Sequence, residues 1–499
     1  MVFGGYDKML EEFLEKLVET IKRNDAPNAE LLKKHNITLG MRDEQGAGIP
    51  VGITTKGCVT GYEKEYSSII DEEEQVTIKK PHVADPSKIF FEVYGRTPDA
   101  KELENFKPKV RSILPFKLKP REGKLQYCGI NIQDIVDANQ NNFGFEETAY
   151  LLLTSELPKT EELEQFKQHL TERRILDKQY RTALIHDYAS DNIMVTMSMA
   201  ILKLHDFDPE HKSTDEKQVL RHCLDIIAKF PTILAYAYHA SQDREGADYT
   251  ITKPSNLPYA EDFLRMLKGE GKYTREEALL LDKYLMLHAE HGGGNNSTFT
   301  TRVVTSSGTN TYSTISSALA SLEGHKHGGA NEDVMKMMKD IKKNVKDWKD
   351  NEEVKEYLRK IIRKQAGNGT GLIYGVGHAV YTLSDPRAGI LKKYARGLAQ
   401  QKGRTDEFEL VDLVGQLAPK VFAEEKGNGK TISPNVDFYS GFVLDCIGID
   451  QKLYTPLFAM ARTAGWTAHR LEQLRQNRII RPAYIEQIPD KPYINMEER

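Results

Sequence analysis

Histidines in glycine-rich segments are the residues of this 499-residue chain whose types and spacing could do chemistry. His327 lies between Gly324, where a predicted helix ends, and the acid-rich sequence that begins at Asn331 and opens the next helix. The positive end of that helix would disfavour an imidazolium ion. A neutral imidazole there could donate a hydrogen bond to a carbonyl oxygen as it becomes enolate-like. A loop histidine bonded to backbone fits the same spacing equally well.

A second candidate, His378, is bracketed by Gly371, Gly375 and Gly377. Glycines allow backbone to come close to a ligand, because no side chain intervenes. Arg387 follows nine positions later and could make a two-point contact with a carboxylate. Such a loop could also cradle phosphates, but the pattern matches neither the dinucleotide-binding fingerprint nor the P-loop.

A carboxylate, Asp437, follows a Ser-Pro-Asn turn. The flanking Val436, Phe438 and Tyr439 could remove water from around it. Desolvation would raise the pKa of the carboxyl and make it a better base towards a weak carbon acid. An aspartate after a turn can equally be a helix cap.

Two further histidines, His288 and His291, would share one face of a helix and so invite a metal hypothesis. Their spacing differs from the His-Glu-x-x-His zinc motif, and no cysteine or acidic partner stands at a fixed offset. We therefore expect no metal. His469, near Arg462 and Arg470, is the weakest histidine candidate taken alone.

Helical periodicity dominates the elements that must position these residues, and it predicts a mainly α fold. Apolar residues repeat at steps of three and four near the N-terminus and in residues 146–156, 192–204, 218–241, 274–288, 311–322 and 331–348. Strand-like alternation is scarce, with its best candidates in residues 36–95 and 126–132.

Two charged or glycine-rich stretches, 346–370 and 424–434, are interpreted as surface connections. The segment between Gly328 and Gly441 is bounded by glycine-rich loops that could act as hinges. We therefore predict a small domain set into a larger one. The predicted division is an N-terminal extension joining the large domain (1–120), the large domain (121–328), the small domain (329–441) and a return to the large domain (442–499).

Composition limits the classes of function. With 69 basic and 73 acidic residues the chain has no general excess of positive charge for binding nucleic acid. Four scattered cysteines without a framework spacing favour a reduced, intracellular setting. The N-terminus looks neither like a signal peptide nor like a transit peptide, and no apolar run approaches the roughly 20 residues that span a bilayer. We expect a cytoplasmic protein.

Five segments, taken in order, resemble the citrate synthase family: residues 287–297, 324–332, 375–387, 433–441 and 461–466. The resemblance covers about residues 124–485. It implies a mainly α homodimer whose subunits each have a large domain and a small mobile domain that closes over the substrates. The implied reaction condenses acetyl-CoA with oxaloacetate and then hydrolyses the thioester to give citrate and CoA.

The resemblance assigns the reaction to three residues. Asp437 looks like the base that takes a proton from the methyl group of the thioester. His327 looks like the group that stabilises the enol or enolate at the thioester oxygen. His378 looks like the acid that protonates the oxygen of the oxo acid as the new bond forms.

Four more residues match positions that hold the dicarboxylate. His291, Arg387 and Arg462 match positions in the same subunit, and Arg481 matches the arginine that the partner subunit contributes. Two carboxylates need at least two guanidinium groups, so this set is chemically reasonable. Neither a metal nor another cofactor is implied.

Two polar residues, Ser297 and Asn435, match supporting positions that orient catalytic groups. The loop whose backbone receives the adenine of CoA is matched by Leu372, Ile373, Tyr374, Gly375, Val376 and Gly377. This chain departs from many relatives at Thr382, where they carry Lys or Arg. If that basic residue touches CoA phosphates, the contact comes here from elsewhere, such as Lys364 or a lysine within 391–404.

Two alternatives share these motifs. A 2-methylcitrate synthase would use propionyl-CoA instead of acetyl-CoA, and one methylene changes discrimination by only about 1–3 kcal/mol. A non-catalytic scaffold or CoA-binding protein of the same fold would be expected to lack a catalytic group, whereas all three are present.

Overall fold

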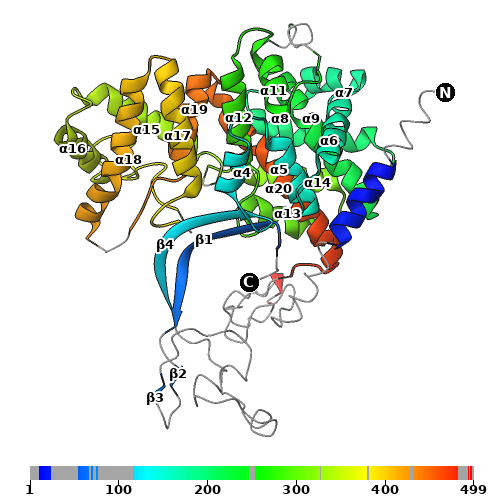
Figure 1. Cartoon of the computed structure of the whole chain (residues 1–499), viewed down its shortest axis with the longest axis horizontal. Coiled ribbons are helices and arrows are strands. Elements are labelled where there is room, and N and C mark those ends of the chain that lie inside the picture. Colours follow the sequence, from blue (N-terminus) through cyan, green and yellow to red (C-terminus); the bar gives the residue numbers. More distant parts are fainter. Residues whose placement is uncertain are drawn as a thin grey trace.

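Helices make up nearly all the regular structure in the computed structural model, so the predicted mainly α fold is confirmed (Figure 1). The structure describes residues 11–23, 54–66, 69–70, 75–76, 116–243, 246, 253–325, 327–378, 381–427, 431–481, 493 and 495–496. No helix of this described part is long and apolar enough to cross a membrane. Residues 11–23 are helical, as their periodicity predicts.

The larger group of helices packs around α20 (Tyr454–Gln476). Every residue of α20 from Tyr454 to Gln473 is buried, and a helix that is buried all round belongs to a core. The helices α5, α9, α12, α13 and α14 pack against it. The members of this group are α4 (Ile132–Ala138), α5 (Phe145–Thr154), α6 (Thr160–Arg173), α7 (Lys178–Ala183), α8 (Ile193–Lys203), α9 (Glu216–Gln242), α11 (Tyr259–Lys268), α12 (Arg275–His288), α13 (Asn296–Ser306) and α14 (Thr311–Glu323).

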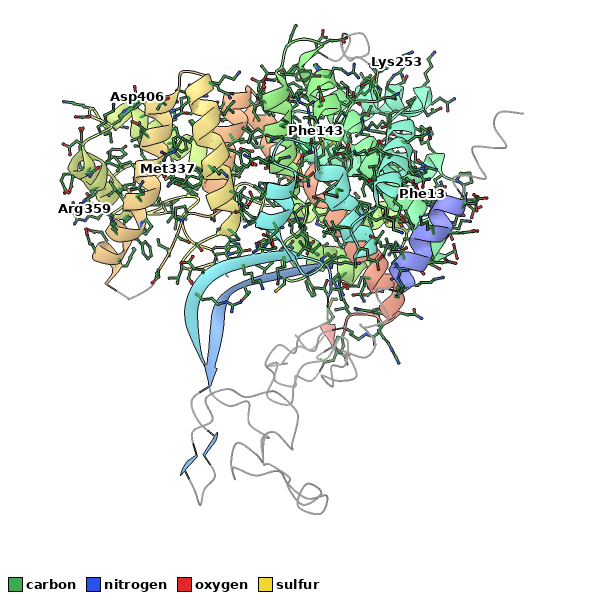
Figure 2. All side chains as sticks on the ribbon, viewed as in Figure 1. Phe13, Phe143, Lys253, Met337, Arg359 and Asp406 are labelled. Carbon is green, nitrogen blue, oxygen red and sulfur yellow. The ribbon has the colours of Figure 1, made fainter. Side chains whose placement is uncertain are left out.

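A second group lies to one side of Figure 1. It consists of α15 (Ala330–Asn344), α16 (Asn351–Ile362), α17 (Pro386–Gln401) and α18 (Thr405–Lys426). In Figure 2, Met337 lies inside this group, whereas Arg359 and Asp406 lie towards its outer edge. The helix α19 (Val436–Ile447) joins the two groups, because it packs on α15 and α17 and also on α12.

One predicted surface connection is wrong in part, because residues 346–370 contain the helix α16. Its buried residues Val354, Leu358, Ile361 and Ile362 follow the spacing of one helix face. The charged residues on the other face hid this stripe. The glycine-rich end of the segment is a turn, as expected of a connection, and Gly367, Gly369 and the following Gly371 have positive φ. In the second connection, 424–434, α18 ends at Lys426 and Gly427 adopts the left-handed conformation that stops a helix.

Strands are few in the described residues. The strand β1 (Gly57–Tyr66) pairs antiparallel with β4 (Phe116–Tyr127), and β4 pairs with the short β5 (Ile130–Asn131). The strands β2 (Ile69–Ile70) and β3 (Gln75–Val76) form a separate pair. The predicted strand regions therefore contain strands where they are described, while residues 36–53, 67–68, 71–74 and 77–95 lie outside the described residues.

Two of the predicted domain boundaries fall inside regular elements. The boundary at 120 lies within β4, and the boundary at 441 lies within α19, which continues to Ile447 and is stopped by the left-handed Gly448. Helices and strands rarely bend in their interior, so domain boundaries would lie in the loops that flank β4 and α19 rather than inside these elements. The division into a large and a small domain stays a prediction.

Candidate active site

His327 lies in the short turn between α14 and α15, where the sequence predicts it. The turn is closed by hydrogen bonds from the backbone N–H groups of His327 and Gly328 to the Gly324 carbonyl, at 2.7 and 3.1 Å. Burial, together with the positive charge of Arg462, lowers the pKa of His327 to about 4. The imidazole is therefore neutral near pH 7. The neutral form is as expected, but its causes are burial and Arg462, which the sequence did not reveal.

Ser297, at the start of α13, fixes the tautomer of His327. The Nε2 atom of His327 lies 3.3 Å from the backbone N–H of Ser297 and 2.9 Å from its hydroxyl oxygen. A backbone N–H can only donate, so Nε2 accepts and the ring proton is on Nδ1. The Ser297 hydroxyl also receives a hydrogen bond from the indole of Trp466, at 3.2 Å. The predicted support of a catalytic group by Ser297 therefore has a structural counterpart.

Asp437 is the second residue of α19 and is capped by Asn435, whose side-chain oxygen accepts from the Asp437 N–H at 3.0 Å. Burial raises the pKa of Asp437 to about 6, although the positive charges of Arg387 and Arg462 oppose the rise. The carboxylate is thus ionised at pH 7 and more basic than an exposed aspartate. The pKa of Asp437 is therefore raised by desolvation, as the sequence predicts.

His378 lies after the glycine-rich loop and stacks on Tyr381, with ring centroids 4.8 Å apart. The backbone N–H of Tyr381 donates to Nδ1 of His378 at 3.1 Å, so the proton of the neutral ring is on Nε2. Burial and the charge of Arg387 lower the pKa of His378 to about 4. The His378 ring is therefore a neutral donor through Nε2.

Arg387, at the start of α17, has the two-point contact with a carboxylate that its type suggests. The partner within the chain is Asp385, which accepts from Nε at 3.0 Å and from Nη2 at 2.8 Å. Asp385 also caps α17 and accepts from the backbone N–H of Val436 at 3.1 Å, so it ties α17 to α19. The guanidinium also lies over the ring of Tyr381.

Arg462 projects from α20 towards the loop between α12 and α13. Its Nε donates to the His288 carbonyl at 2.7 Å, and its guanidinium lies over the Phe458 ring. The Nη2 atom is buried and has no hydrogen-bond partner in the described part of the chain, and the same is true of Nε2 of His291. A buried guanidinium with an unpartnered donor is suited to a carboxylate ligand.

The two arginines connect the candidate residues electrostatically. Arg462 acts on the pKa of His327, His291 and Asp437. Arg387 acts on the pKa of His291, His378 and Asp437. The rings of His291 and His378 lie 5.2 Å apart. Four of the predicted site residues, His291, His327, His378 and Asp437, therefore surround the two buried cations Arg387 and Arg462, a pattern that is suited to a small dicarboxylate.

Arg481 is the exception among the predicted substrate residues. It is exposed and lies beyond the C-terminal end of α20. Among the described residues it makes no hydrogen bond to the other six. The same position is expected of a residue that contributes to the site of a partner subunit, because such a residue does not contact the site of its own subunit.

The predicted CoA loop, residues 372–377, is held against the start of α19. Gly377 donates to the Ser433 carbonyl at 2.8 Å, and the Asn435 side chain donates to the Gly377 carbonyl at 2.8 Å. Gly375 has φ +72°, and an added Cβ would lie 2.6 Å from Val334 and 2.9 Å from the Phe438 backbone. Only glycine fits at this position.

Leu372 and Tyr374 line a cavity of about 230 Å³ beside this loop. Its other lining residues include Lys336 on α15 and Asn368. Thr382, where many relatives have a basic residue, is buried. Of the lysines considered as substitutes, Lys364 is exposed, whereas Lys392 and Lys402 are ion-paired with Asp412 and Glu277.

Sequence reasoning missed several members of the site. Asp385 was noted only as a neighbour of Arg387, although an Asp followed by Pro is a recognisable N-cap of a helix. Tyr381 and Trp466 gave no signal, because aromatic residues are common in cores. Glu290 and the weakly ranked His469 form a buried pair at 2.8 Å beneath His291. No local pattern marks that pair, whose members are 179 residues apart.

Comparisons with known proteins point to one family. A family model described as "Citrate synthase, C-terminal domain" matches residues 109–483 of this chain. The citrate synthase of Haloferax volcanii is 35% identical over 364 residues, which cover 72% of this chain and 88% of that protein. The citrate synthase of Synechocystis sp. is 36% identical over 381 residues, which cover 76% and 89%.

Solved structures give the same result. The crystal structure of citrate synthase from Pyrobaculum aerophilum matches with a TM-score of 0.63 and 30% identity, over 75% of this chain and 90% of that chain. The ternary complex of carboxymethyl coenzyme A and oxalateacetate with citrate synthase from Thermoplasma acidophilum matches with a TM-score of 0.61 and 27% identity, over 75% of this chain and 93% of that chain.

Proposed function

The chain belongs to the citrate synthase family, and we propose that it condenses acetyl-CoA with oxaloacetate through Asp437, His327 and His378. The observation that carries the proposal is the set of protonation states at these residues. The carboxyl of Asp437, whose pKa is raised, lies in one site with two neutral imidazoles. Ser297 donates to Nε2 of His327, so that ring carries its proton on Nδ1, and Tyr381 donates to Nδ1 of His378, so that ring carries its proton on Nε2. Enolisation of a thioester requires such a base and such donors.

The first step is removal of a proton from the methyl group of acetyl-CoA by the Asp437 carboxylate. The electron pair of the broken C–H bond forms the carbon–carbon double bond of an enolate, and the negative charge moves to the thioester oxygen. The Nδ1–H of His327 donates to that oxygen and stabilises it. A neutral imidazole is a weak acid, so it can donate without being consumed as an acid.

The second step forms the carbon–carbon bond. The enolate carbon attacks the oxo carbon of oxaloacetate, and the electron pair of the broken C=O π bond moves to the oxygen. His378 supplies the proton from Nε2 to this oxygen, which gives a citryl-CoA intermediate. The imidazolate that remains takes a proton from solvent, and Asp437 releases the methyl proton to solvent, so both residues return to their starting states. Water then hydrolyses the thioester, with citrate and CoA as the products.

The two carboxylates of oxaloacetate would be held by His291, Arg387 and Arg462. Support comes from the buried, unpartnered nitrogens of His291 (Nε2) and Arg462 (Nη2) and from the electrostatic effect of Arg387 on His378. Two buried cations attract a dianion strongly, because few water molecules screen them. This pairing also orients the oxo group towards His378.

Acetyl-CoA would enter along residues 372–377, with its adenine at the backbone of that loop. Support comes from Gly375 and Gly377, whose left-handed conformations shape the loop without side chains in the way, and from the cavity beside Leu372 and Tyr374. Asn435 ties this loop to the helix that carries Asp437. Binding of CoA and placement of the base are therefore mechanically linked.

The proposal is tested by a thiol-release assay of the purified protein with oxaloacetate and either acetyl-CoA or propionyl-CoA. We expect a higher kcat/KM with acetyl-CoA and citrate as the product, as the citrate synthase relatives indicate. A higher kcat/KM with propionyl-CoA would instead indicate a 2-methylcitrate synthase. The absence of thiol release with both would favour the non-catalytic alternative.

A homodimer is proposed, with Arg481 completing the partner's site. Support comes from Val195, Met199 and Leu202, which are large apolar residues exposed along α8. Their spacing places them on one helix face, and an exposed apolar face of this kind is typical of a subunit interface. Light scattering is expected to give twice the chain mass of 56.7 kDa; a mass of one chain would contradict the dimer.

Metal-independent catalysis is proposed as well. In the part of the chain that the structure describes, no three His, Cys, Asp or Glu residues come together as a metal site. Arg387 and Arg462 supply the positive charge that the substrate carboxylates require. Dialysis against a chelator should leave kcat unchanged, whereas a loss that added metal restores would contradict this proposal.

A cytoplasmic location is proposed from the thiols. All four cysteines are free, and Cys128, Cys223 and Cys446 have a pKa raised by burial, so they resist oxidation. Fractionation of cells is expected to recover the protein with the cytosolic fraction. Recovery with membranes or medium would exclude this location.

A further inference from the structure

A buried carboxylate, Glu290, directly precedes His291 and takes no part in the reaction described above. It lies in the loop between α12 and α13 (residues 289–295, the α12–α13 loop) and is fully buried. Its Oε1 accepts from the backbone N–H of Gly292 at 2.6 Å and from Nε2 of His469 at 2.8 Å. Glu290 and Gly292 flank His291 in the sequence, so the contact between them closes the backbone around that residue, while His469 anchors the carboxylate to α20.

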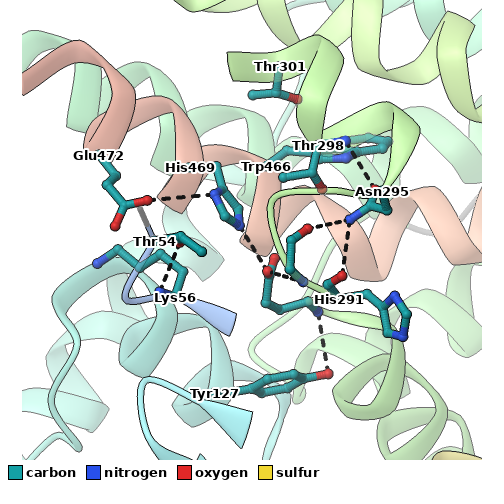
Figure 3. Close-up of polar contacts among 12 residues, drawn as sticks. Thr54, Lys56, Tyr127, His291, Asn295, Thr298, Thr301, Trp466, His469 and Glu472 are labelled. Carbon is teal, nitrogen blue, oxygen red and sulfur yellow. Dashed lines mark hydrogen bonds and ion pairs between the residues drawn. The ribbon is translucent and has the colours of Figure 1, made fainter. Parts of the chain in front are cut away.

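His469 is kept in one tautomer by the next residue of the network. Nη1 of Arg302, on α13, lies 2.8 Å from Nδ1 of His469, and a guanidinium can only donate. Nδ1 is therefore the acceptor, and Nε2 carries the proton that is donated to Glu290. Arg302 in turn donates to Glu472 at 2.6 Å. Figure 3 shows His469 and Glu472 on the same helix, behind the loop that carries His291.

Glycines on two other elements leave Glu290 no room to move. An added Cβ at Gly57, the first residue of β1, would lie 2.5 Å from Oε1 of Glu290. An added Cβ at Gly465 of α20 would lie 2.5 Å from Oε2. The carboxylate is thus enclosed between the start of a strand and the centre of the core helix. Gly292, with φ +76°, lets the loop turn around it.

The N-terminal region takes part in the same network. The backbone N–H of Thr55 donates to Oε1 of Glu472 at 2.9 Å, and its hydroxyl lies 3.2 Å from the same atom. Tyr127 of β4 donates to the Met286 carbonyl at 2.9 Å, next to the end of α12. Residues 54–57 therefore contact the network at both Glu472 and Glu290.

We propose that Glu290 and His469 are positioning residues that set the orientation of His291 for the dicarboxylate, and that residues 54–57 complete their support. The inference rests on the proposed role of His291 in binding oxaloacetate. Glu290 holds its negative charge in this enclosure: burial alone would raise its pKa, but His469, Arg462 and the Gly292 N–H lower it below the ordinary value. A charged acceptor makes both hydrogen bonds strong.

The test compares His469→Ala and His469→Gln in the full chain, with both substrates varied. Alanine removes the donor to Glu290, and the KM for oxaloacetate is expected to rise about tenfold or more. The KM for acetyl-CoA is expected to change less than threefold. Glutamine can place an N–H near the position of Nε2, so it should restore the KM for oxaloacetate to within about threefold of the wild type. The matched control is Thr467→Ala, another buried residue of α20, whose hydroxyl bonds only within its own helix.

A purely structural role of His469 would give a different result. The melting temperature and the fraction of active protein would fall in His469→Ala, while the KM for oxaloacetate of the folded fraction would stay unchanged. That outcome would overturn the inference. If His469→Ala does not fold, Gly57→Ala provides the test, since its methyl group would displace the Glu290 carboxylate. The control for that variant is Gly397→Ala, where an added methyl group meets nothing within 4 Å.

His291→Ala, measured in parallel, separates this inference from the proposed function. A raised KM for oxaloacetate in His291→Ala, with an unchanged KM in both His469→Ala and Gly57→Ala, would refute the positioning role alone. An unchanged KM in His291→Ala would refute the assignment of His291 and with it the premise of the inference. Raised values in all three variants would support both.

Discussion

At the scale of the residue, the candidate site depends on where protons reside. His327 and His378 are both neutral near pH 7, because burial lowers the pKa of each to about 4. Asp437 is shifted in the opposite direction, because burial disfavours its charged form. One environment therefore provides two donors and one base at the same pH.

These shifts predict the pH dependence of kcat/KM for oxaloacetate. Asp437 must be ionised to act as the base, so activity should fall as the pH drops through about 6, the pKa of its carboxyl. On the acid side, the logarithm of kcat/KM should rise with pH with a slope of one, which corresponds to the loss of one proton, since the two histidines titrate only near pH 4. Steady-state rates between pH 4.5 and 8 provide the measurement. A steeper limb near pH 6 would mean that a histidine titrates there as well.

Sequence reasoning could reach the residue types but not their environments. The glycine-rich setting of His327 and His378 is visible in the sequence, whereas the burial that neutralises them comes from distant elements such as α20, which carries Arg462. Asp437 gave almost no signal alone, because an aspartate after a turn is usually a cap. The Glu290–His469 contact was invisible, because it joins residues 179 positions apart.

At the scale of the element, three site residues occupy the same position in a helix. Ser297, Arg387 and Asp437 are the second residues of α13, α17 and α19. Each helix is capped by a side chain just before its first residue: Asn295, Asp385 and Asn435. A capped first turn is rigid, so it holds a side chain in one place.

Asn435→Ala tests this element directly. Loss of the cap should lower the free energy of unfolding by about 1 kcal/mol. Because Asn435 also holds the Gly377 carbonyl, kcat should fall by about tenfold or more as His378 and Asp437 lose their common support. Denaturant titration and steady-state kinetics measure the two effects.

Asn310→Ala is the matched control, since Asn310 caps α14 through Ser313 at 2.8 Å and holds no part of the site. It should lose a similar free energy of unfolding and keep the wild-type kcat. Equal kcat values in the two variants would show that the cap of α19 has no role beyond stability.

Helices were predicted correctly where the apolar residues form one continuous stripe along the sequence. The helices α12 and α14 have nearly their predicted bounds, and α15 ends four residues early at Asn344. The helix α16 was missed because charged residues outnumber its four buried apolar residues. Capping residues such as Asp385 could have been recognised from the sequence, because Asp-Pro is a common helix start.

At the scale of the whole molecule, the site lies between two groups of helices. His327 and Arg462 come from the larger group or its edge, whereas His378, Arg387 and the loop 372–377 come from the segment around α17. Ligand binding between two such groups favours closure, because each group supplies part of the contact. The predicted boundary at 441 falls within α19, because sequence cannot show that this helix continues through Gly441. The division into a large and a small domain stays a prediction.

Closure predicts a compaction on binding oxaloacetate. The radius of gyration from small-angle scattering should decrease when saturating oxaloacetate is added, because the group α15–α18 moves towards the larger group. Sodium sulfate at the same ionic strength is the control for a general salt effect. An unchanged radius of gyration with oxaloacetate would argue for a preformed, closed site.

The central claim is that Asp437 is the base of a citrate-forming condensation, and the most direct test is the rate of thiol release by Asp437→Asn. The variant keeps the shape of the side chain and cannot accept the methyl proton. It is expected to unfold at no lower denaturant concentration than the wild type at pH 8, because it removes a buried charge. With acetyl-CoA and oxaloacetate its kcat should fall by at least about a thousandfold. A kcat within tenfold of the wild type would contradict the account.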